Sequence, residues 1–147
     1  MKKLYTIFTA CIAMLLTSCQ EYSYIENELH GFWQVTQVEN TLTGESSETK
    51  GDLYYSFQRS MVMLNYKSPT KPSGMMMTQY LTTFDLSTDS ITMGDFRINM
   101  EYDKKVDLEA LHKFGIYDEY TTFAWDIEKN QTLILTSDKA RITLRKY

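Results

Sequence analysis

Side chains that could perform catalysis are sparse in this sequence of 147 residues. It contains two histidines, and Glu109 precedes His112 by three residues, a spacing more typical of a surface pair on a helix than of a catalytic base with its orienting acid. The sequence contains no glycine-rich phosphate loop, no His-x-x-x-His and no Gly-x-Ser-x-Gly motif. We therefore expect a protein that is not an enzyme and that needs no cofactor.

Methionine is unusually abundant, with nine residues in the chain. Thioethers are soft ligands for Cu(I), so one interpretation of this abundance is a copper site. In a strand, however, Met75 and Met77 share one face while Met76 points to the other, so the triplet cannot form one cluster. We expect no metal site, and we expect the methionines to fill a core or to line an adaptable apolar cavity.

The N-terminal residues indicate export and lipid attachment. Lys2 and Lys3 precede an uncharged apolar run over residues 4–16, which at about 13 residues is shorter than a bilayer-spanning helix. The run ends in Leu-Thr-Ser-Cys at Cys19, which resembles the bacterial lipobox, where the signal is cut before the cysteine and the cysteine is acylated. We therefore expect Cys19 to carry the lipid that attaches the protein to the membrane.

Cleavage at this point would divide the chain into a signal peptide at 1–18, a lipidated tether at 19–28 and one domain at 29–147. Cys11 would leave with the signal, so no disulfide is expected. The formal net charge of −4 argues against a nucleic-acid partner, which would require a basic face. The expected location is the cell envelope, with the outer membrane favoured because Gln20 rather than Asp follows the cysteine.

The rest of the sequence predicts an all-β fold. Aromatic residues make up 14% of the chain, which contains eleven tyrosines and only six glycines. Aromatic residues are enriched in strands and glycine is depleted there, so this composition favours strands. Asp107 and Gly115 could begin and end one short helix near 107–114. About eight short antiparallel strands tend to close, so an up-and-down barrel is predicted, with a sandwich as the alternative. Apolar periodicity and turn residues place the strands at 32–38, 53–58, 61–66, 75–86, 90–93, 96–102, 120–128, 132–136 and 140–145.

Two groups of residues resemble known proteins. Gly31-Phe32-Trp33 resembles the Gly-x-Trp opening of lipocalins, and residues 111–117, 122–128, 132–135 and 140–146 look like the closing hairpins of small lipocalin-like lipoproteins of gut Bacteroidetes. The resemblance implies an eight-stranded lipocalin-like barrel with a lipid anchor and no catalytic residue. It also implies that Trp33 closes one end of the barrel under a basic residue of the last strand, for which Arg141 and Arg145 are available.

Apolar strand faces with a few hydroxyls predict a site in the barrel mouth for a small apolar or amphipathic ligand. The alternative is a non-catalytic protein-interaction or inhibitor module whose barrel is filled by side chains and whose loops at 41–52 and 67–74 carry the function. Strand faces select the candidate lining residues Tyr55, Phe57, Met61, Met63, Met75, Met77 and Phe123.

Replacement of Cys19→Ser is expected to abolish lipid attachment, because the lipobox modification is made on a thiol. The intact mass of the purified full-length chain would show this as the absence of the diacylglycerol and acyl increments. Cys11→Ser is the matched control and should be lipidated normally, since Cys11 lies inside the predicted signal. Acyl mass on the Cys19→Ser chain would contradict the assignment.

Overall fold

The computed structural model describes residues 28–68, 77–129 and 131–147. Strands dominate the described part, and all of their pairings are antiparallel. The elements in chain order are β1 (Gly31–Asn40), β2 (Ser46–Glu48), β3 (Leu53–Gln58), β4 (Met61–Tyr66), β5 (Thr78–Leu86), β6 (Ser90–Gly94), β7 (Arg97–Ile98), β8 (Glu101–Lys105), α2 (Leu108–His112), β9 (Tyr120–Glu128), β10 (Thr132–Thr136) and β11 (Ala140–Lys146).

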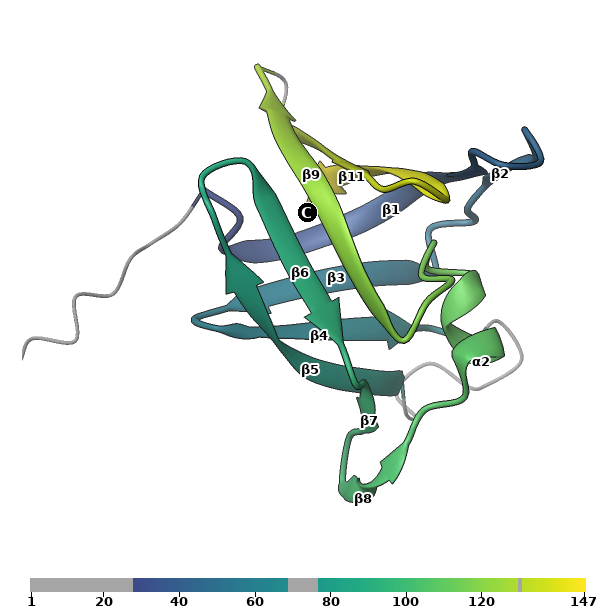
Figure 1. Cartoon of the computed structure of the whole chain (residues 1–147), viewed down its shortest axis with the longest axis vertical. Coiled ribbons are helices and arrows are strands. Elements are labelled where there is room, and N and C mark those ends of the chain that lie inside the picture. Colours follow the sequence, from purple (N-terminus) through teal and green to yellow (C-terminus); the bar gives the residue numbers. More distant parts are fainter. Residues whose placement is uncertain (1–27, 69–76, 130) are drawn as a thin grey trace, which may run out of the picture.

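Eight of these strands form a closed ring in the order β4-β3-β1-β11-β10-β9-β6-β5, and the pairing of β4 with β5 completes it (Figure 1). Each ring strand is bonded to the ring strands that precede and follow it in the chain, and β1 is bonded to β11, as in an up-and-down barrel. β2 pairs with β1 beside the ring, and β7 and β8 extend from β5. The predicted barrel of about eight strands is confirmed for the described residues, and the alternative sandwich is not formed.

The side chains of each strand alternate between the barrel interior and its surface. In β11, Ala140, Ile142 and Leu144 have no exposed area, whereas Arg141 and Arg145 are exposed. Strand side chains have a period of two, so an apolar residue at every second position places a continuous row inside the barrel. Burial of these rows stabilises the fold by roughly 25 cal/mol for each Å² of apolar surface removed from water.

The predicted strand at 96–102 is wrong, because the chain turns within it. Met100 has a left-handed backbone with φ of 73° and is 83% exposed, and β8 folds back antiparallel to β7. The period-two pattern of this run is therefore split, with Phe96 buried and Tyr102 exposed.

β2 forms inside the predicted loop at 41–52, because β1 extends beyond its pairing with β3 and offers residues 37–39 to another strand.

The short helix predicted near 107–114 is confirmed as α2. Asp107 precedes it in an extended conformation, although its side chain makes no capping hydrogen bond, contrary to expectation. Gly115 has φ of 80°, and its N–H bonds to the carbonyl of His112 at 2.9 Å. A Cβ atom at Gly115 would lie 2.7 Å from Cγ1 of Ile142 and 3.3 Å from Cγ1 of Val38. Glycine is thus required here both by backbone conformation and by close packing against β1 and β11.

Gly115→Ala is expected to lower the free energy of unfolding by about 2–4 kcal/mol, because a left-handed backbone and a steric clash act together. Gly44→Ala is the matched control, since Gly44 has φ of 73° but no atom within 4 Å of the added Cβ. Its cost should be about 1–2 kcal/mol, the cost of the backbone conformation alone. Urea denaturation of both variants measures the difference between them. An equal decrease in the free energy of unfolding would show that the packing at Gly115 is loose.

Candidate functional site

Three of the predicted lining residues lie inside the barrel and are fully packed. Tyr55, Phe57 and Phe123 have no exposed area, so none of them borders a space that admits a water-sized molecule. The rings of Tyr55 and Phe57 stack with centroids 5.9 Å apart. Burial raises the pKa of Tyr55, which keeps its hydroxyl protonated and able to donate a hydrogen bond. In this structure these side chains are core and not the wall of a cavity.

The prediction that Met61 and Met63 line the interior is wrong, because both face outward. In the β3–β4 pairing Tyr55 lies opposite Leu64 and shares its face, while Met63 lies opposite Ser56. Val62, next to both methionines, is completely buried, whereas Met61 is 46% exposed. The set that faces outward contains Asn65 beside the two methionines, and the inner set contains Val62, Leu64 and Tyr66, so the polar residue marks the outer face and only two apolar positions pointed the other way.

The remaining predicted residues are not brought to an interior site. Met77 lies just before β5 and is 41% exposed. Met75 and the predicted lipid-attachment residue Cys19 lie outside the described residues. The seven predicted lining residues therefore divide into three that belong to the core, three that face outward or are exposed, and one whose position is not described.

One end of the barrel is closed around Trp33, which is 1% exposed. Its indole Nε1 donates a hydrogen bond of 2.7 Å to the carbonyl of Leu29, which precedes β1. The ammonium of Lys146 lies 4.4 Å from the centroid of the Trp33 ring and donates a hydrogen bond of 2.6 Å to the carbonyl of His30. The cation therefore joins the last strand to the chain entering β1 and covers the indole.

The sequence predicted Arg141 or Arg145 in this position, and that prediction is wrong. Trp33 pairs directly with Lys146 in the β1–β11 ladder, so the two side chains share the inner face. Arg145 is one residue earlier, points outward and donates a hydrogen bond of 2.8 Å to Oε1 of Gln34. Arg141 is exposed and lies six residues before the end of the chain, opposite Glu39.

The other end of the barrel is filled by the segment from Val106 to Ile116, which includes α2 (Figure 1). Phe114 and Ile116 are completely buried, and Leu111 is 4% exposed. The Tyr55 hydroxyl donates a buried hydrogen bond of 2.7 Å to the carbonyl of Phe114. We call this region the α2 end; a molecule entering here meets Phe114 before it can reach the core.

Exposed ion pairs flank the segment that fills the α2 end. Before it, Lys105 pairs with Glu119 and lies 3.7 Å from Asp95. After it, Asp118 pairs with Lys139 on the turn before β11. The hydrogen bond and charge of Glu119 raise the pKa of Lys105, and the bond from Arg97 lowers the pKa of Asp95. Exposed pairs of this kind stabilise a fold only modestly, so they hold this segment less firmly than the core holds the strands.

A cleft of about 240 Å³ lies beside these ion pairs, between α2 and the connection from β6 to β8. Its floor is apolar and includes Phe96 and Leu111, both of which are buried. The backbone N–H of Val106 bonds to the carbonyl of Phe96 at 2.9 Å and forms part of this floor. The cleft therefore lies between the start of α2 and the chain that connects β6 to β7.

Four side chains form what we call the α2-end rim, of which the first three are partly buried and the last is exposed: Tyr66, Tyr80, Ile98 and Lys113. The ammonium of Lys113 lies 3.7 Å from the centroid of the Tyr66 ring. The rings of Tyr80 and Phe114 meet edge to face with centroids 6.3 Å apart, and Tyr80 pairs with Ile98 across β5 and β7. Apolar surface and one cation thus lie together at this end of the barrel.

One ammonium, that of Lys113, and two carboxylates, those of Asp52 and Asp107, set the electrostatic environment of the α2-end rim. Burial lowers the pKa of Lys113, an effect that the negative charge of Asp52 opposes. Burial raises the pKa of Tyr80, and the charge of Asp107 adds to that shift. A partly desolvated ammonium recovers solvation by pairing with an anion. Lys113 was not predicted from the sequence, because the burial of Phe114 and the approach of the ammonium to Tyr66 depend on the tertiary structure.

The described residues hold no group of three or more His, Cys, Asp or Glu side chains close enough to bind a metal ion. In the same part of the chain, no helix has both the length and the apolar character needed to cross a bilayer. The side chains that do converge, at the α2-end rim, are aromatic, aliphatic and cationic, which is a set suited to binding.

The closed eight-stranded barrel, with Trp33 at one end and a helix at the other, defines a lipocalin-like protein. The model of a family described as a lipocalin-like domain matches residues 14–147, and the chain belongs to that family. The family and fold implied by the resemblance in the sequence are therefore confirmed. No curated protein matches the chain.

Two solved structures share this fold. A lipocalin-like protein from Bacteroides uniformis is similar with a TM-score of 0.58 at 17% identity, over 82% of this chain and 100% of that one. An uncharacterized protein from Bacteroides eggerthii is similar with a TM-score of 0.59 at 14% identity, over the same shares of the two chains. At these identities the likeness extends to the fold and not to the ligand.

Lys146→Met is expected to lower the free energy of unfolding by about 1–2 kcal/mol, because it removes the ammonium from the Trp33 ring and from the His30 carbonyl. The methionine retains an apolar chain, so the loss reports on the charge. Arg145→Met is the control and should cost less than about 0.5 kcal/mol, as is usual at an exposed position. Urea denaturation followed by tryptophan fluorescence measures both, and a larger loss for Arg145→Met would contradict the assignment.

Proposed function

We propose that this protein is a non-catalytic lipoprotein of the cell envelope that binds a small apolar or amphipathic molecule at the α2 end of its barrel. The observation that carries the proposal is the α2-end rim, where Tyr66, Tyr80 and Ile98 offer half-buried apolar surface beside the Lys113 ammonium. Apolar walls with a few polar groups that orient the ligand are the usual composition of small-molecule sites.

The packing of the core determines how deep such a ligand could bind. Tyr55 and Phe114 are fully buried and bonded to each other, so the ligand rests on Phe114 or displaces the segment that carries it. That segment is short, and the interactions at its flanks are solvent-exposed ion pairs, so its local opening requires less free energy than unfolding of the barrel. An acidic group on the ligand would pair with Lys113 while its apolar part covers Tyr66 and Tyr80.

The attachment to the membrane is the second part of the proposal. It rests on the basic start, the short apolar run and the lipobox-like tetrapeptide that ends at Cys19. A lipid on Cys19 would hold the barrel near a bilayer, where apolar and amphipathic molecules are concentrated. We favour the outer membrane, because Gln20 follows the cysteine.

A second candidate function is a protein-interaction or inhibitor module with a barrel filled by side chains. The complete burial of Tyr55, Phe57 and Phe123 favours it, since an interior without water-sized space beside these residues has no room for a ligand there. The two functions differ in one measurable respect, which is whether the purified barrel holds a small molecule.

Lys113→Gln is expected to weaken binding of the anionic probe 1-anilinonaphthalene-8-sulfonate by about fivefold and to leave the neutral probe N-phenyl-1-naphthylamine unchanged, because only the first can pair with the ammonium. Fluorescence titration of residues 20–147, which contain the whole closed barrel, measures both probes. Lys129→Gln is the matched control, since Lys129 is exposed in the turn at the opposite end.

Native mass spectrometry of the same purified chain tests the class of function directly. A bound small molecule, released on denaturation, would support the proposed function. A chain with no bound molecule, together with equal probe affinities for the Lys113→Gln and Lys129→Gln variants, would reject it in favour of the filled module.

A further inference from the structure

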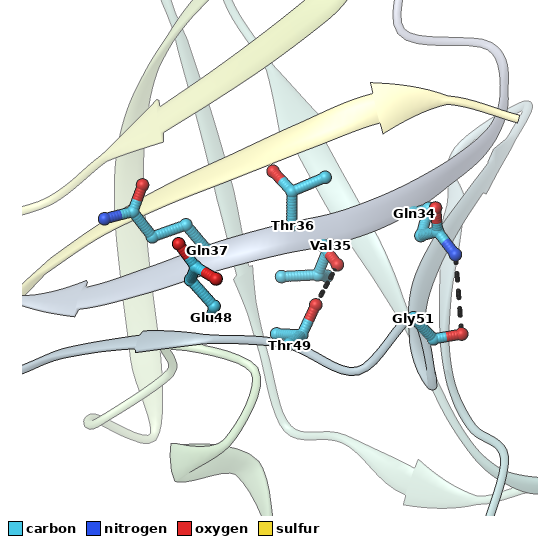
Figure 2. A pocket seen from close by; sticks show the side chains of 7 residues that line it. All are labelled: Gln34, Val35, Thr36, Gln37, Glu48, Thr49 and Gly51. Carbon is cyan, nitrogen blue, oxygen red and sulfur yellow. Dashed lines mark hydrogen bonds between the residues drawn. The ribbon is translucent and has the colours of Figure 1, made fainter.

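A second recessed surface lies on the outside of the barrel, beside β1, and the α2 end takes no part in it (Figure 2). It is a cleft of about 360 Å³, within the range typical of small-ligand sites. β1 and the chain from β2 to β3 form its walls. The lining residues are Gln34, Val35, Thr36, Gln37, Glu48, Thr49 and Gly51.

The cleft results from a change of partner along one edge of β1. Residues 31–34 pair with β3, whereas residues 37–39 pair with β2, and the register of β1 against β11 shifts between Val35 and Gln37. Thr49 bridges the gap, donating its N–H to the Thr36 carbonyl at 3.0 Å and its hydroxyl to the Val35 carbonyl. A β-bulge of this kind redirects the flanking side chains, so Gln34 and Gln37 both point outward.

The Gln34 amide is already bonded to Gly51, Tyr54 and Arg145, so the side chains that offer acceptors to a ligand are Gln37 and Glu48. Figure 2 shows Gln37 and Glu48 at one end, and Gln34 with the backbone of Gly51 at the other. Gln37 bonds to Ser46 through its amide nitrogen at 2.7 Å, which leaves its carbonyl oxygen to accept. Among the described residues, no lysine or arginine lies within ion-pair distance of Glu48. An unpaired carboxylate repels anions and accepts strongly from hydroxyl groups.

An aromatic cluster adjoins the cleft on the same outer face. The rings of Phe32 and Tyr54 stack with centroids 5.0 Å apart, and Tyr147, which is 77% exposed, meets both edge to face. The Tyr54 hydroxyl donates to the Gly51 carbonyl at 2.7 Å and accepts from the Gln34 amide at 3.3 Å. These two bonds make the aromatic cluster continuous with the polar cleft.

We propose that the cleft and the aromatic cluster together form a binding site for a neutral oligosaccharide. Such a molecule presents neighbouring hydroxyl groups, which pair with amide and carboxylate groups, and C–H faces, which pack on aromatic rings. The carboxylate of Glu48 disfavours acidic sugars at its end of the cleft, while the cation of Arg145 donates a hydrogen bond to Gln34 at the other end. This site lies outside the barrel and does not depend on the function proposed for the α2 end.

The test is saturation-transfer-difference NMR on the full-length protein in micelles of a polyoxyethylene detergent, which contains no sugar. The probes are cellotetraose, maltotetraose, xylotetraose and N-acetylchitotetraose, with tetragalacturonate as the acidic comparison. At least one neutral tetrasaccharide should bind in the millimolar range or tighter, and tetragalacturonate should bind at least about tenfold more weakly.

Variants at exposed positions localise the binding. Glu48→Ala and Gln37→Ala should each weaken it by about tenfold, the loss expected for a charged or well-placed hydrogen bond, with unchanged circular dichroism. Asp126→Ala, on the exposed outer face of β9, and Lys113→Gln, at the α2 end, should leave it unchanged. Failure of all four neutral sugars to bind, or equal binding by Glu48→Ala and Asp126→Ala, would overturn the proposal while leaving the function at the α2 end untouched.

Discussion

The pairing of β4 with β5 is the interaction on which the rest of this structure depends, because it converts a sheet into a closed barrel. Closure removes the open edges of the ring and divides every strand into an inner and an outer row of side chains. The inner volume is limited, so each inner residue must fit its neighbours. Tyr55 and Phe57 on β3 are matched by Leu64 and Val62 on β4, and all four are completely buried.

The two ends of the barrel are closed by different physical means. At one end Trp33 contacts both Leu29 and Lys146, and the pairing of β1 with β11 holds the indole and the ammonium in place. At the other end a separate segment carries Phe114 into the barrel, and exposed ion pairs hold its flanks. Local stability is lower where the interactions are solvent-exposed, so a barrel of this construction would open at the α2 end.

A filled interior shifts recognition to the rims and to the outer surface. The α2-end rim combines apolar rings with the Lys113 ammonium, whereas the cleft beside β1 combines amides with the Glu48 carboxylate. The first site is mainly aromatic and the second mainly polar, so they suit different classes of molecule. The outer site lies where one edge of β1 changes partner from β3 to β2, and the bulge at the same point interrupts the β1–β11 ladder, whose pairing resumes at Gln37.

The sequence by itself determined most strands of the ring, because period-two patterns and turn residues act over a few neighbouring positions, whereas β2 and the β7–β8 hairpin were not predicted. The bounds of β3, β4, β9 and β10 were predicted correctly, and so was the place of α2. Which face of a strand points inward was decided only by the tertiary structure. Met61 and Val62 are both apolar, and only the pairing of β4 with β3 places Val62 inside; likewise, only the register of β11 against β1 selects Lys146 over Arg145. A shift of one residue reverses every side chain of a strand, and that shift is set by neighbours distant in the chain.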